Sequence, residues 1–406
     1  MSEWKECKLG DAPLEIIDGD RGKNYPSQDE FFSSEHTLFL STKNVRKTGF
    51  DFQECQFITK DKDEKLRKGK LSRNDLVVTT RGTVGNLAFY NKNIPFENIR
   101  INSGMVLVRP EPNKLNPLFN YYIFRFLQSD FETFSTGSAQ PQLPIRDMKE
   151  IPILLPPLAE QKAIAGVLSA LDDKIDLLHR QNKTLEAMAE ALFRQWFVRG
   201  PELAEGEEAE ESLEEGKLGD LVTIVSGTTP KTENPEFWNG EYHWTSPRDI
   251  TNLNGLFLFD TERKITKLGL DQIGSGLLPA GSLLMSSRAP VGALAFAEIP
   301  VAINQGYAGI ICDKGYKREF IYLWLKANMD MVHSYANGST FQEISKSAFK
   351  SLDISIPDPK KMATFHSIID NKFEKIRLNS IQIRSLEKLR DTLLPKLMSG
   401  EVRVEV

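Results

Sequence analysis

The chain has 406 residues, of which 40% are hydrophobic and 26% are charged, values that are ordinary for a soluble globular protein of two or three domains. No run approaches the roughly 18 apolar residues of a membrane-spanning helix, and the sequence starts without an apolar signal segment, so neither a membrane protein nor a secreted one is expected. Taken as an average, the net charge of −5 disfavours a nucleic-acid partner.

The first part of the chain predicts strands, then a helix, then a further strand. Short segments rich in β-forming residues and separated by Gly and Asn predict strands at 76–79, 87–90 and 105–108. Residues 116–130 place apolar and aromatic side chains at helical spacing, which predicts an amphipathic helix whose aromatic stripe packs into a core. A short apolar strand closed by prolines is expected at 151–157.

A long helix is predicted next, from about residue 158 to residue 197. Leu171, Leu178, Leu185 and Leu192 lie seven residues apart, and an apolar repeat of this period is typical of a coiled-coil seam. A helix of about forty residues is about 60 Å long.

An acidic segment follows the long helix. Residues 201–216 hold eight Glu and no Lys or Arg, a composition typical of a solvated, self-repelling linker. Without these eight charges the balance of −5 becomes +3, so the rest of the chain is mildly basic. The net charge of the whole chain therefore does not exclude DNA, although it does not prove DNA binding either.

The second half of the chain repeats the first. The segment RGTVGNLAF at 81–89 returns as RAPVGALAF at 288–296, and the flanking matches keep their order while the offset drifts only from 209 to 201. Each copy is domain-sized, so this is an internal duplication and not a solenoid repeat. The other matched pairs are Lys8–Asp11 with Lys217–Asp220, Ser41–Val45 with Ser246–Ile250, Ile101–Gly104 with Ile303–Gly306, and Gly137-Ser138 with Gly338-Ser339.

The second copy also ends in a long helix. A helix is predicted at 318–332, a short strand at 354–359 and a second apolar-striped helix at 360–398. Neither long stripe can stay exposed, so the two helices are expected to pack against each other. Asn182 and Asn379 interrupt the stripes, either as buried residues that fix the register or as residues at a seam edge that faces water.

These elements predict an α/β (α+β) fold with a pseudo-two-fold internal repeat, in which a pair of long antiparallel coiled-coil helices separates two similar globular domains. The tail is expected to return towards the first domain. The expected boundaries are 1–157 for the first domain, 158–199 for the central helix, 200–216 for the linker, 217–359 for the second domain, 360–398 for the C-terminal helix and 399–406 for the tail.

Several motifs resemble the DNA-specificity subunit of type I restriction–modification systems. The most specific are LPPLAEQKAIA at 155–165, ALFRQWF at 191–197 and LLPKLMSGEVRV at 393–404. WKECKLGD at 4–11 and the repeated Arg-x-x-Val-Gly segment support them, and the resemblance covers essentially the whole chain. The long Glu-rich linker is not part of the family pattern, which leaves the tethering of the second domain open.

The resemblance implies two target-recognition domains that each read one half of a split DNA site, with the coiled coil as a spacer. It implies a complex with two methyltransferase (M) subunits and with restriction (R) subunits. S-adenosylmethionine, ATP and Mg are expected on those partners, and no cofactor is expected on this chain. A cytoplasmic location is expected separately, from three widely spaced cysteines that suggest reduced thiols. The runner-up hypothesis is a stand-alone DNA-binding scaffold or adaptor that uses the same two-headed architecture with other partners.

Residues that the two copies share cannot distinguish two different half-sites, so they are expected to be scaffold or phosphate contacts. Arg81 and Arg288 are shared and follow hydroxyl residues, of which Thr80 and Ser287 are the nearest. An Arg beside Thr or Ser suits a phosphate, and the alternative is an Arg that binds loop carbonyls within the domain.

Residues that differ at matched loop positions are the candidates for reading bases. Asn44 and Asp249 differ and lie beside the basic residues Lys43 and Arg248, and an amide and a carboxylate suit different bases. The alternative is a solvated turn. The other DNA-binding candidates are the basic residues Arg46 and Lys47 and the polar residues Gln140, Gln142, Thr340 and Gln342, while Tyr25 and Trp238 are expected either to stack on DNA or to lie in the core.

The sequence does not predict catalysis by this chain. The nearest approach to a methyltransferase motif, at 116–119, is better explained as a helix cap, and Asp260, Glu262 and Lys264 are better explained as a charged strand than as a nuclease site. No Walker-type loop is present. Three widely spaced cysteines and five histidines without metal-ligand spacing predict reduced thiols and no metal site.

Overall fold

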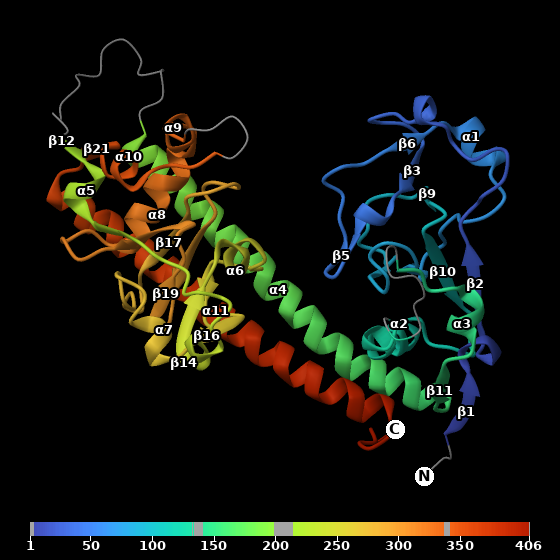
Figure 1. Cartoon of the computed structure of the whole chain (residues 1–406). Helices are drawn as coiled ribbons and strands as arrows, with labels where there is room; N and C mark the ends of the chain where they lie inside the picture. Colours follow the sequence, from blue (N-terminus) through green and yellow to red (C-terminus); the bar gives the residue numbers. More distant parts are fainter. Residues whose placement is uncertain (1–3, 132, 134–140, 199–213, 337–341, 406) are drawn as a thin grey trace. The chain divides into compact units, whose positions relative to one another are not determined.

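The computed structural model describes residues 4–131, 133, 141–198, 214–336 and 342–405, and Figure 1 shows the whole chain. The chain divides into two compact units. Unit 1 comprises Met1–Lys174 together with Leu386–Val406, and unit 2 comprises Ile175–Ser385. The C-terminal segment therefore belongs with the N-terminal domain, as the sequence predicted.

Unit 1 is built on a four-stranded sheet with the order β2-β10-β7-β8 and a three-stranded sheet with the order β6-β3-β9. Two further antiparallel pairs, β1 with β11 and β4 with β5, complete its strands. The strands are β1 Lys5–Lys8, β2 Leu14–Asp18, β3 Thr37–Leu40, β4 Val45–Arg46, β5 Gly49–Phe50, β6 Phe57–Ile58, β7 Leu76–Thr79, β8 Leu87–Phe89, β9 Ile99–Ile101, β10 Met105–Pro110 and β11 Pro152–Leu155.

Alternation along the strands sends side chains to two different cores in unit 1. Leu76 and Val78 of β7 join a core with helix α2, whereas Val77 between them faces a second core with the three-stranded sheet. The helices are α1 Lys60–Lys65, α2 Pro117–Phe126 and α3 Ile145–Lys149, with 3-10 turns η1 Leu9–Asp11, η2 Gln28–Glu30, η3 Thr42–Asn44 and η4 Leu127–Ser129.

Unit 2 repeats this plan. Its larger sheet has the order β13-β20-β17-β18-β15, its three-stranded sheet has the order β16-β14-β19, and β12 pairs with β21. In both units the central strand of the smaller sheet lies parallel to one neighbour, β3 to β9 and β14 to β19. The strands are β12 Glu214–Lys217, β13 Thr223–Ser226, β14 Trp238–Thr245, β15 Phe257–Leu258, β16 Arg263–Ile265, β17 Leu283–Ser286, β18 Leu294–Ala297, β19 Val301–Ile303, β20 Tyr307–Ile311 and β21 Asp353–Ile356.

The helical segments of unit 2 occupy the same places as those of unit 1, but three 3-10 turns of unit 1 (η1, η3 and η4) are α-helices in unit 2 (α5, α6 and α9). In unit 1 the helix expected at 116–130 ends at Phe126 and continues as the turn η4. The helix expected at 318–332 is divided into two at Asn328, which lies outside the helical conformation and caps both pieces. The shorter helices and the 3-10 turn are α5 Leu218–Leu221, η5 Pro235–Phe237, α6 Pro247–Thr251, α7 Lys267–Leu270, α8 Arg318–Ala327, α9 Met329–Ser334 and α10 Lys346–Lys350.

The two long helices are α4, Leu158–Phe197, and α11, Pro359–Met398, and both have residues in each unit. In unit 1, Ile164 and Leu168 near the start of α4 share a core with Leu397 near the end of α11. In unit 2, Phe193 near the end of α4 contacts Phe365 near the start of α11. The helices are therefore antiparallel, as expected.

Asn379 is a buried seam residue and not a solvated edge. Its side chain is 1% exposed and donates to the Asn182 side chain across the helix pair at 2.9 Å. Leu178, one of the predicted seam leucines, is likewise 1% exposed. A paired buried amide costs stability unless both partners align, so this pair favours one register of the two helices.

The C-terminal tail lies against the start of the chain. The Arg403 guanidinium lies over the Trp4 ring at 4.5 Å, and both side chains reach Glu160 on α4, each at 2.7 Å. The expected linker at 200–216 ends earlier than predicted, because Glu214–Lys217 form strand β12. Within the described ranges, no helix combines the length and the apolar character that crossing a membrane requires.

Candidate nucleic-acid interface

The loops that the sequence singled out come together in unit 1. The carbonyl of Gly104, in the turn after β9, accepts hydrogen bonds from the backbone amides of Thr80 at 2.8 Å and Arg81 at 3.2 Å. The carbonyl of Thr80 accepts from the amide of Leu143 at 2.9 Å, which adds the segment that follows Gln142. The loop after β3 joins them, because Asn86 donates through its side chain to the carbonyl of Val45 at 2.9 Å.

Unit 2 builds the same cluster with the matched residues. The amide of Ser287 donates to the carbonyl of Gly306 at 2.8 Å, and the carbonyl of Ser287 accepts from the amide of Ile344 at 3.0 Å. The amide of Asn304 donates to the carbonyl of Thr245 at 3.1 Å, at the start of the α6 loop. The predicted candidate segments are therefore neighbours within each unit.

A further loop belongs to each cluster, the loop after the first strand of the larger sheet, in which the sequence reasoning had singled out only Tyr25 and Trp238. Gly19 and Gly227 follow the first strand of each larger sheet. A Cβ on Gly19 would lie 2.3 Å from the carbonyl oxygen of Asn102, and a Cβ on Gly227 would lie 1.7 Å from that of Ile303. Only glycine permits this close backbone approach. The two glycines stand 208 residues apart, within the drift of the repeat, so the signal was present in the sequence.

Asn44 does not have the geometry of a base reader, and this expectation is corrected. Its side chain is 5% exposed, and its oxygen accepts from the backbone amide and hydroxyl of Ser41 at 2.9 and 3.0 Å. Its amide group donates to the carbonyls of Asp51 and Glu54 at 3.0 and 2.7 Å. All four hydrogen-bonding positions of the amide are used, so none remains for a base.

Asp249 has the same structural role in unit 2, which corrects the second expected reader. Its carboxylate caps the start of α6 by accepting from the amide and hydroxyl of Ser246 at 2.8 and 3.2 Å. Its other oxygen accepts from the amide of Glu262 at 3.1 Å. The Ser-x-x-Asn and Ser-x-x-Asp spacings are two forms of one capping box, so a difference at this position does not imply a difference in recognition.

The basic residues beside these caps are exposed. Lys43, Arg46 and Lys47 project from unit 1, where Arg46 also pairs with Asp51 at 3.3 Å. Arg248 is exposed at the corresponding place in unit 2. DNA contact by these four residues stays a prediction, and their exposure and charge are those that a phosphate contact requires.

The hydroxyl residues before the shared arginines are buried. Thr80 is 4% exposed and its hydroxyl donates to the carbonyl of Gly104 at 3.1 Å, so it builds the cluster and has no proton left for a phosphate. Ser287 is 5% exposed. The expected joint use of hydroxyl and arginine on a phosphate is therefore not supported at Thr80.

The shared arginines differ in their surroundings. Arg81 is half-buried, and its Nε, which is not accessible to water, has no hydrogen-bond partner among the described residues. Arg288 is exposed, and its Nε lies 3.1 Å from the carboxylate of Glu343. Each arginine forms an isolated backbone bridge, Arg81 with Gln142 and Arg288 with Glu343, so these two partners occupy matched positions.

Gln142 is half-buried and Gln342 is exposed, so both remain candidates at the edge of their clusters. Gln140 and Thr340 lie outside the described residues. Trp238 lies in the core, since it is 6% exposed, donates from its ring nitrogen to the carbonyl of Lys231 at 3.1 Å and stacks under Arg263. Tyr25 is half-buried and packs edge-on against Phe39.

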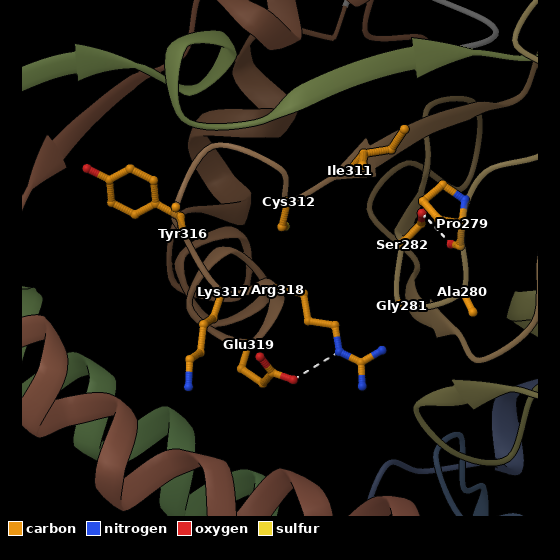
Figure 2. Close-up of a pocket in the computed structure, with 11 residues that line it drawn as sticks. Pro279, Ala280, Gly281, Ser282, Ile311, Cys312, Tyr316, Lys317, Arg318 and Glu319 are labelled. Atoms are coloured by element: carbon orange, nitrogen blue, oxygen red, sulfur yellow. Dashed lines mark hydrogen bonds and ion pairs between the residues drawn. The ribbon is translucent and has the colours of Figure 1, made fainter.

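A separate pocket of about 480 Å³ lies elsewhere in unit 2, between residues 279–282 and 311–319 (Figure 2). Arg318 in this pocket donates to Glu319 at 2.9 Å and to Glu298 at 2.7 Å, so its charge is already compensated. Burial raises the pKa of the Cys312 thiol to about 12, which leaves it protonated and unreactive at neutral pH. Among the described residues, no group of three or more His, Cys, Asp or Glu side chains is arranged to hold a metal ion.

Two matched domains, each with the same loop cluster and each with different exposed side chains, define a protein with two related recognition modules. Comparison with known proteins identifies the modules. The sequence family described as "Type I restriction modification DNA specificity domain" matches residues 1–187 and again residues 210–387. The chain belongs to this family, and its role is that of a DNA-recognition subunit of a type I restriction–modification system.

Named relatives agree with this assignment. The chain is 25% identical to the HindI specificity subunit of Haemophilus influenzae over an alignment of 474 positions, which covers 99% of this chain and all of that protein. It is 33% identical to the MjaIX specificity subunit of Methanocaldococcus jannaschii over 179 residues, 43% of this chain and 40% of that protein. The crystal structure of the S subunit from M. genitalium shares the fold, with a TM-score of 0.57, 17% identity and coverage of 98% and 96%.

Proposed function

We propose that each unit reads one half of a bipartite DNA target through its own loop cluster. The observation that carries the proposal is the duplication of the cluster itself. The backbone bonds between Thr80 and Gly104 in unit 1 and between Ser287 and Gly306 in unit 2 are equivalent, whereas the exposed side chains around them differ. A shared scaffold with different surface residues is what two readers of different half-sites require.

Within each cluster, the buried residues fix the loops and the exposed cations bind phosphates. Lys43, Arg46 and Lys47 in unit 1, Arg248 in unit 2 and the matched pair Arg81 and Arg288 are proposed as phosphate contacts, which position the domain without carrying sequence information. Base recognition then falls to polar side chains at exposed positions where the two clusters differ, such as Gln342 in unit 2.

We further propose that α4 and α11 set the number of base pairs between the half-sites and dock two methyltransferase subunits, and that restriction subunits join the same complex. Two continuous helices of 40 residues each form a stiffer spacer than a loop does. The chain itself is proposed to be non-catalytic, with S-adenosylmethionine, ATP and Mg bound by the partner subunits. The stand-alone adaptor is the less favoured alternative, because the family match covers both copies.

The test is a genome-wide map of methyladenine in the host with and without this gene. Loss of methylation at one split motif, and its return when the wild-type gene is restored, is the expected result. A second strain carries the chain with one seven-residue heptad deleted at matched places in α4 and α11. This strain is expected to retain both half-sites and change only the spacer. An unchanged map after deletion of the gene, or loss of a motif that is not split, would overturn the proposal.

A further inference from the structure

The turns after β9 and β19 differ at one position in the centre of each cluster. Unit 1 has Asn102-Ser103-Gly104 and unit 2 has Asn304-Gln305-Gly306. In both turns the asparagine side chain accepts from the glycine amide, at 2.9 Å in unit 1 and 2.8 Å in unit 2, so the backbone shape is the same. Only the side chain between them changes, from a short hydroxyl to a long amide.

Gln305 lies at the surface of the unit 2 cluster. Its side chain is exposed. The next residue, Gly306, lies against Pro247 at the start of α6, and its carbonyl accepts a hydrogen bond from the amide of Ser287. The exposed Arg248 follows Pro247 in the sequence, and the exposed Arg288 follows Ser287. Gln305 therefore lies between the two loops that carry the proposed phosphate contacts of unit 2.

The Gln305 side chain is restrained by a neighbour from the loop after β13. Its Oε1 accepts a hydrogen bond from the Thr229 hydroxyl at 2.7 Å. Thr229 is anchored in turn, because Gly227 two residues earlier packs against the Ile303 backbone and permits no side chain. Holding a long side chain in one conformation lowers the entropy lost on binding.

The remaining hydrogen-bonding capacity of Gln305 matches one base. The bond from Thr229 uses one lone pair of Oε1, which leaves the other lone pair and the two hydrogens of the amide nitrogen. Adenine presents an N6 amino donor and an N7 acceptor side by side in the major groove, and a glutamine amide pairs with both. We propose that Gln305, positioned by Thr229, reads an adenine in the half-site bound by unit 2; this inference rests on the proposed function.

Unit 1 has different chemistry at the same place. Ser103 replaces Gln305, and Arg21, which matches Thr229 in sequence, donates to the Ser103 carbonyl at 3.4 Å and pairs with Asp18 at 3.1 Å. A guanidinium has donors and no acceptor, so it does not pair with adenine as an amide does. Unit 1 therefore lacks, at the matched position, the amide that pairs with both groups of adenine.

The test selects preferred sequences from duplexes randomised in one half-site at a time, using the full chain together with the subunits that co-purify with it. Gln305→Ala is expected to reduce the preference for adenine at one position of one half-site by roughly tenfold to a hundredfold. Gln305→Glu is expected to replace adenine with cytosine there, because a carboxylate accepts from the cytosine amino group. Thr229→Val is expected to weaken the same adenine preference by a smaller factor.

A matched control is available beside Thr229. Thr228 is exposed, and its hydroxyl has no hydrogen-bond partner in the part of the chain that the structure describes, so Thr228→Val is expected to leave selection unchanged. The inference is overturned if Gln305→Ala and Gln305→Glu select the wild-type sequence in both halves while the wild-type complex remains specific. A wild-type complex that selects no sequence instead overturns the proposed function and the inference with it.

Discussion

The two units hold the same three-stranded sheet together with different chemistry. In unit 1, Arg100 at the centre of β9 is 5% exposed and forms an ion pair with Asp63, which is 2% exposed. At the centre of β19 in unit 2 the matched residue is Ala302, which packs in an apolar cluster with Trp238 and Trp244. One topology thus tolerates either a buried charge network or an aromatic core, because the backbone pairing of the strands is the same in both.

The difference has an energetic consequence. A buried ion pair stabilises a fold only when both charges remain and their hydrogen bonds are complete. Apolar packing tolerates the loss of some of its contacts, because no charge is left without a partner. Arg100 meets this condition through further bonds to the carbonyls of Lys68 at 2.7 Å and Leu66 at 3.0 Å. Unit 1 is therefore expected to be the more sensitive of the two to a single change of charge.

The largest expected effect comes from breaking this ion pair. Arg100→Met is expected to destabilise unit 1 by about 3–5 kcal/mol, since buried Asp63 keeps only the half-exposed Lys70 as a partner and the carbonyls of Lys68 and Leu66 lose their donor. Hydrogen exchange should locate the loss in β3 and β9 and leave β14 and β19 protected. The double variant Arg100→Met with Asp63→Leu should recover much of the stability, because it removes both charges. A single variant that costs under about 1 kcal/mol would contradict the comparison.

The same pair predicts a dependence on pH that unit 2 lacks at this position. Burial alone would raise the pKa of Asp63, but hydrogen bonds from Lys70 and Arg100 outweigh it and hold the pKa below its ordinary value. A carboxylate with a lowered folded pKa contributes stability above its unfolded pKa of about 4 and loses it as the pH falls through the folded value. Acid unfolding monitored by hydrogen exchange should therefore begin in unit 1, and the double variant should remove this early step.

A second, smaller difference lies in the helices that cover the larger sheets. The fourth residue of α2 is Asn120 and the fourth residue of α8 is Ile321, and both are fully buried. Neither the oxygen nor the nitrogen of the Asn120 amide has a hydrogen-bond partner among the described residues. An unsatisfied buried polar group costs about 1–3 kcal/mol, so unit 1 carries a penalty here that unit 2 avoids.

Exchanging these two residues should remove the energetic penalty from unit 1 and introduce it in unit 2. Asn120→Ile is expected to stabilise unit 1 by about 1–3 kcal/mol, measured by denaturant unfolding of the full chain. The reverse change, Ile321→Asn, is the matched control and should destabilise unit 2, since it adds an unsatisfied amide and removes apolar packing. If Asn120→Ile lowers stability, the amide has a role that the free chain does not reveal.

The sequence predicted the fold more completely than the site. The ends of α4 at Leu158 and Phe197 were predicted correctly, because the heptad repeat and the flanking prolines are strong local signals. The break at Asn328 and the early start of β12 were not predicted. The break is a local change of backbone conformation at Asn328, whose side chain donates to the carbonyl of Trp324, and the apolar pattern continues across it. Strand β12 forms only by pairing with the distant β21, which no local pattern indicates.

The errors at the site have a common physical origin. Asn44 and Asp249 were expected to read bases because they differ between the copies, but both are caps whose side chains are used within their own loops. The Ser-x-x-Asn and Ser-x-x-Asp spacings would have indicated this role. Gln305 was missed because its neighbour Thr229 lies 76 residues away in sequence, and no local pattern brings the two together.

The smallest expected effect concerns the shared arginines, which the sequence treated as equivalent. Arg81→Ala is expected to weaken binding to all sequences and reduce the salt slope by about one ion, as for the loss of one phosphate contact. Arg288→Ala is expected to reduce the slope by less, because the carboxylate of Glu343 lies 3.1 Å from its Nε and already offsets part of its charge. Glu343→Gln, which copies the residue type of Gln142, should raise the slope of unit 2 towards that of unit 1.

The measurement is the affinity for duplexes with one half-site randomised, at several salt concentrations. Equal slopes for the two alanine variants would mean that the Glu343 carboxylate turns away from Arg288 on DNA. A change in the preferred bases without a change in slope would instead make the arginines readers and leave the phosphate contacts to Lys43, Arg46, Lys47 and Arg248.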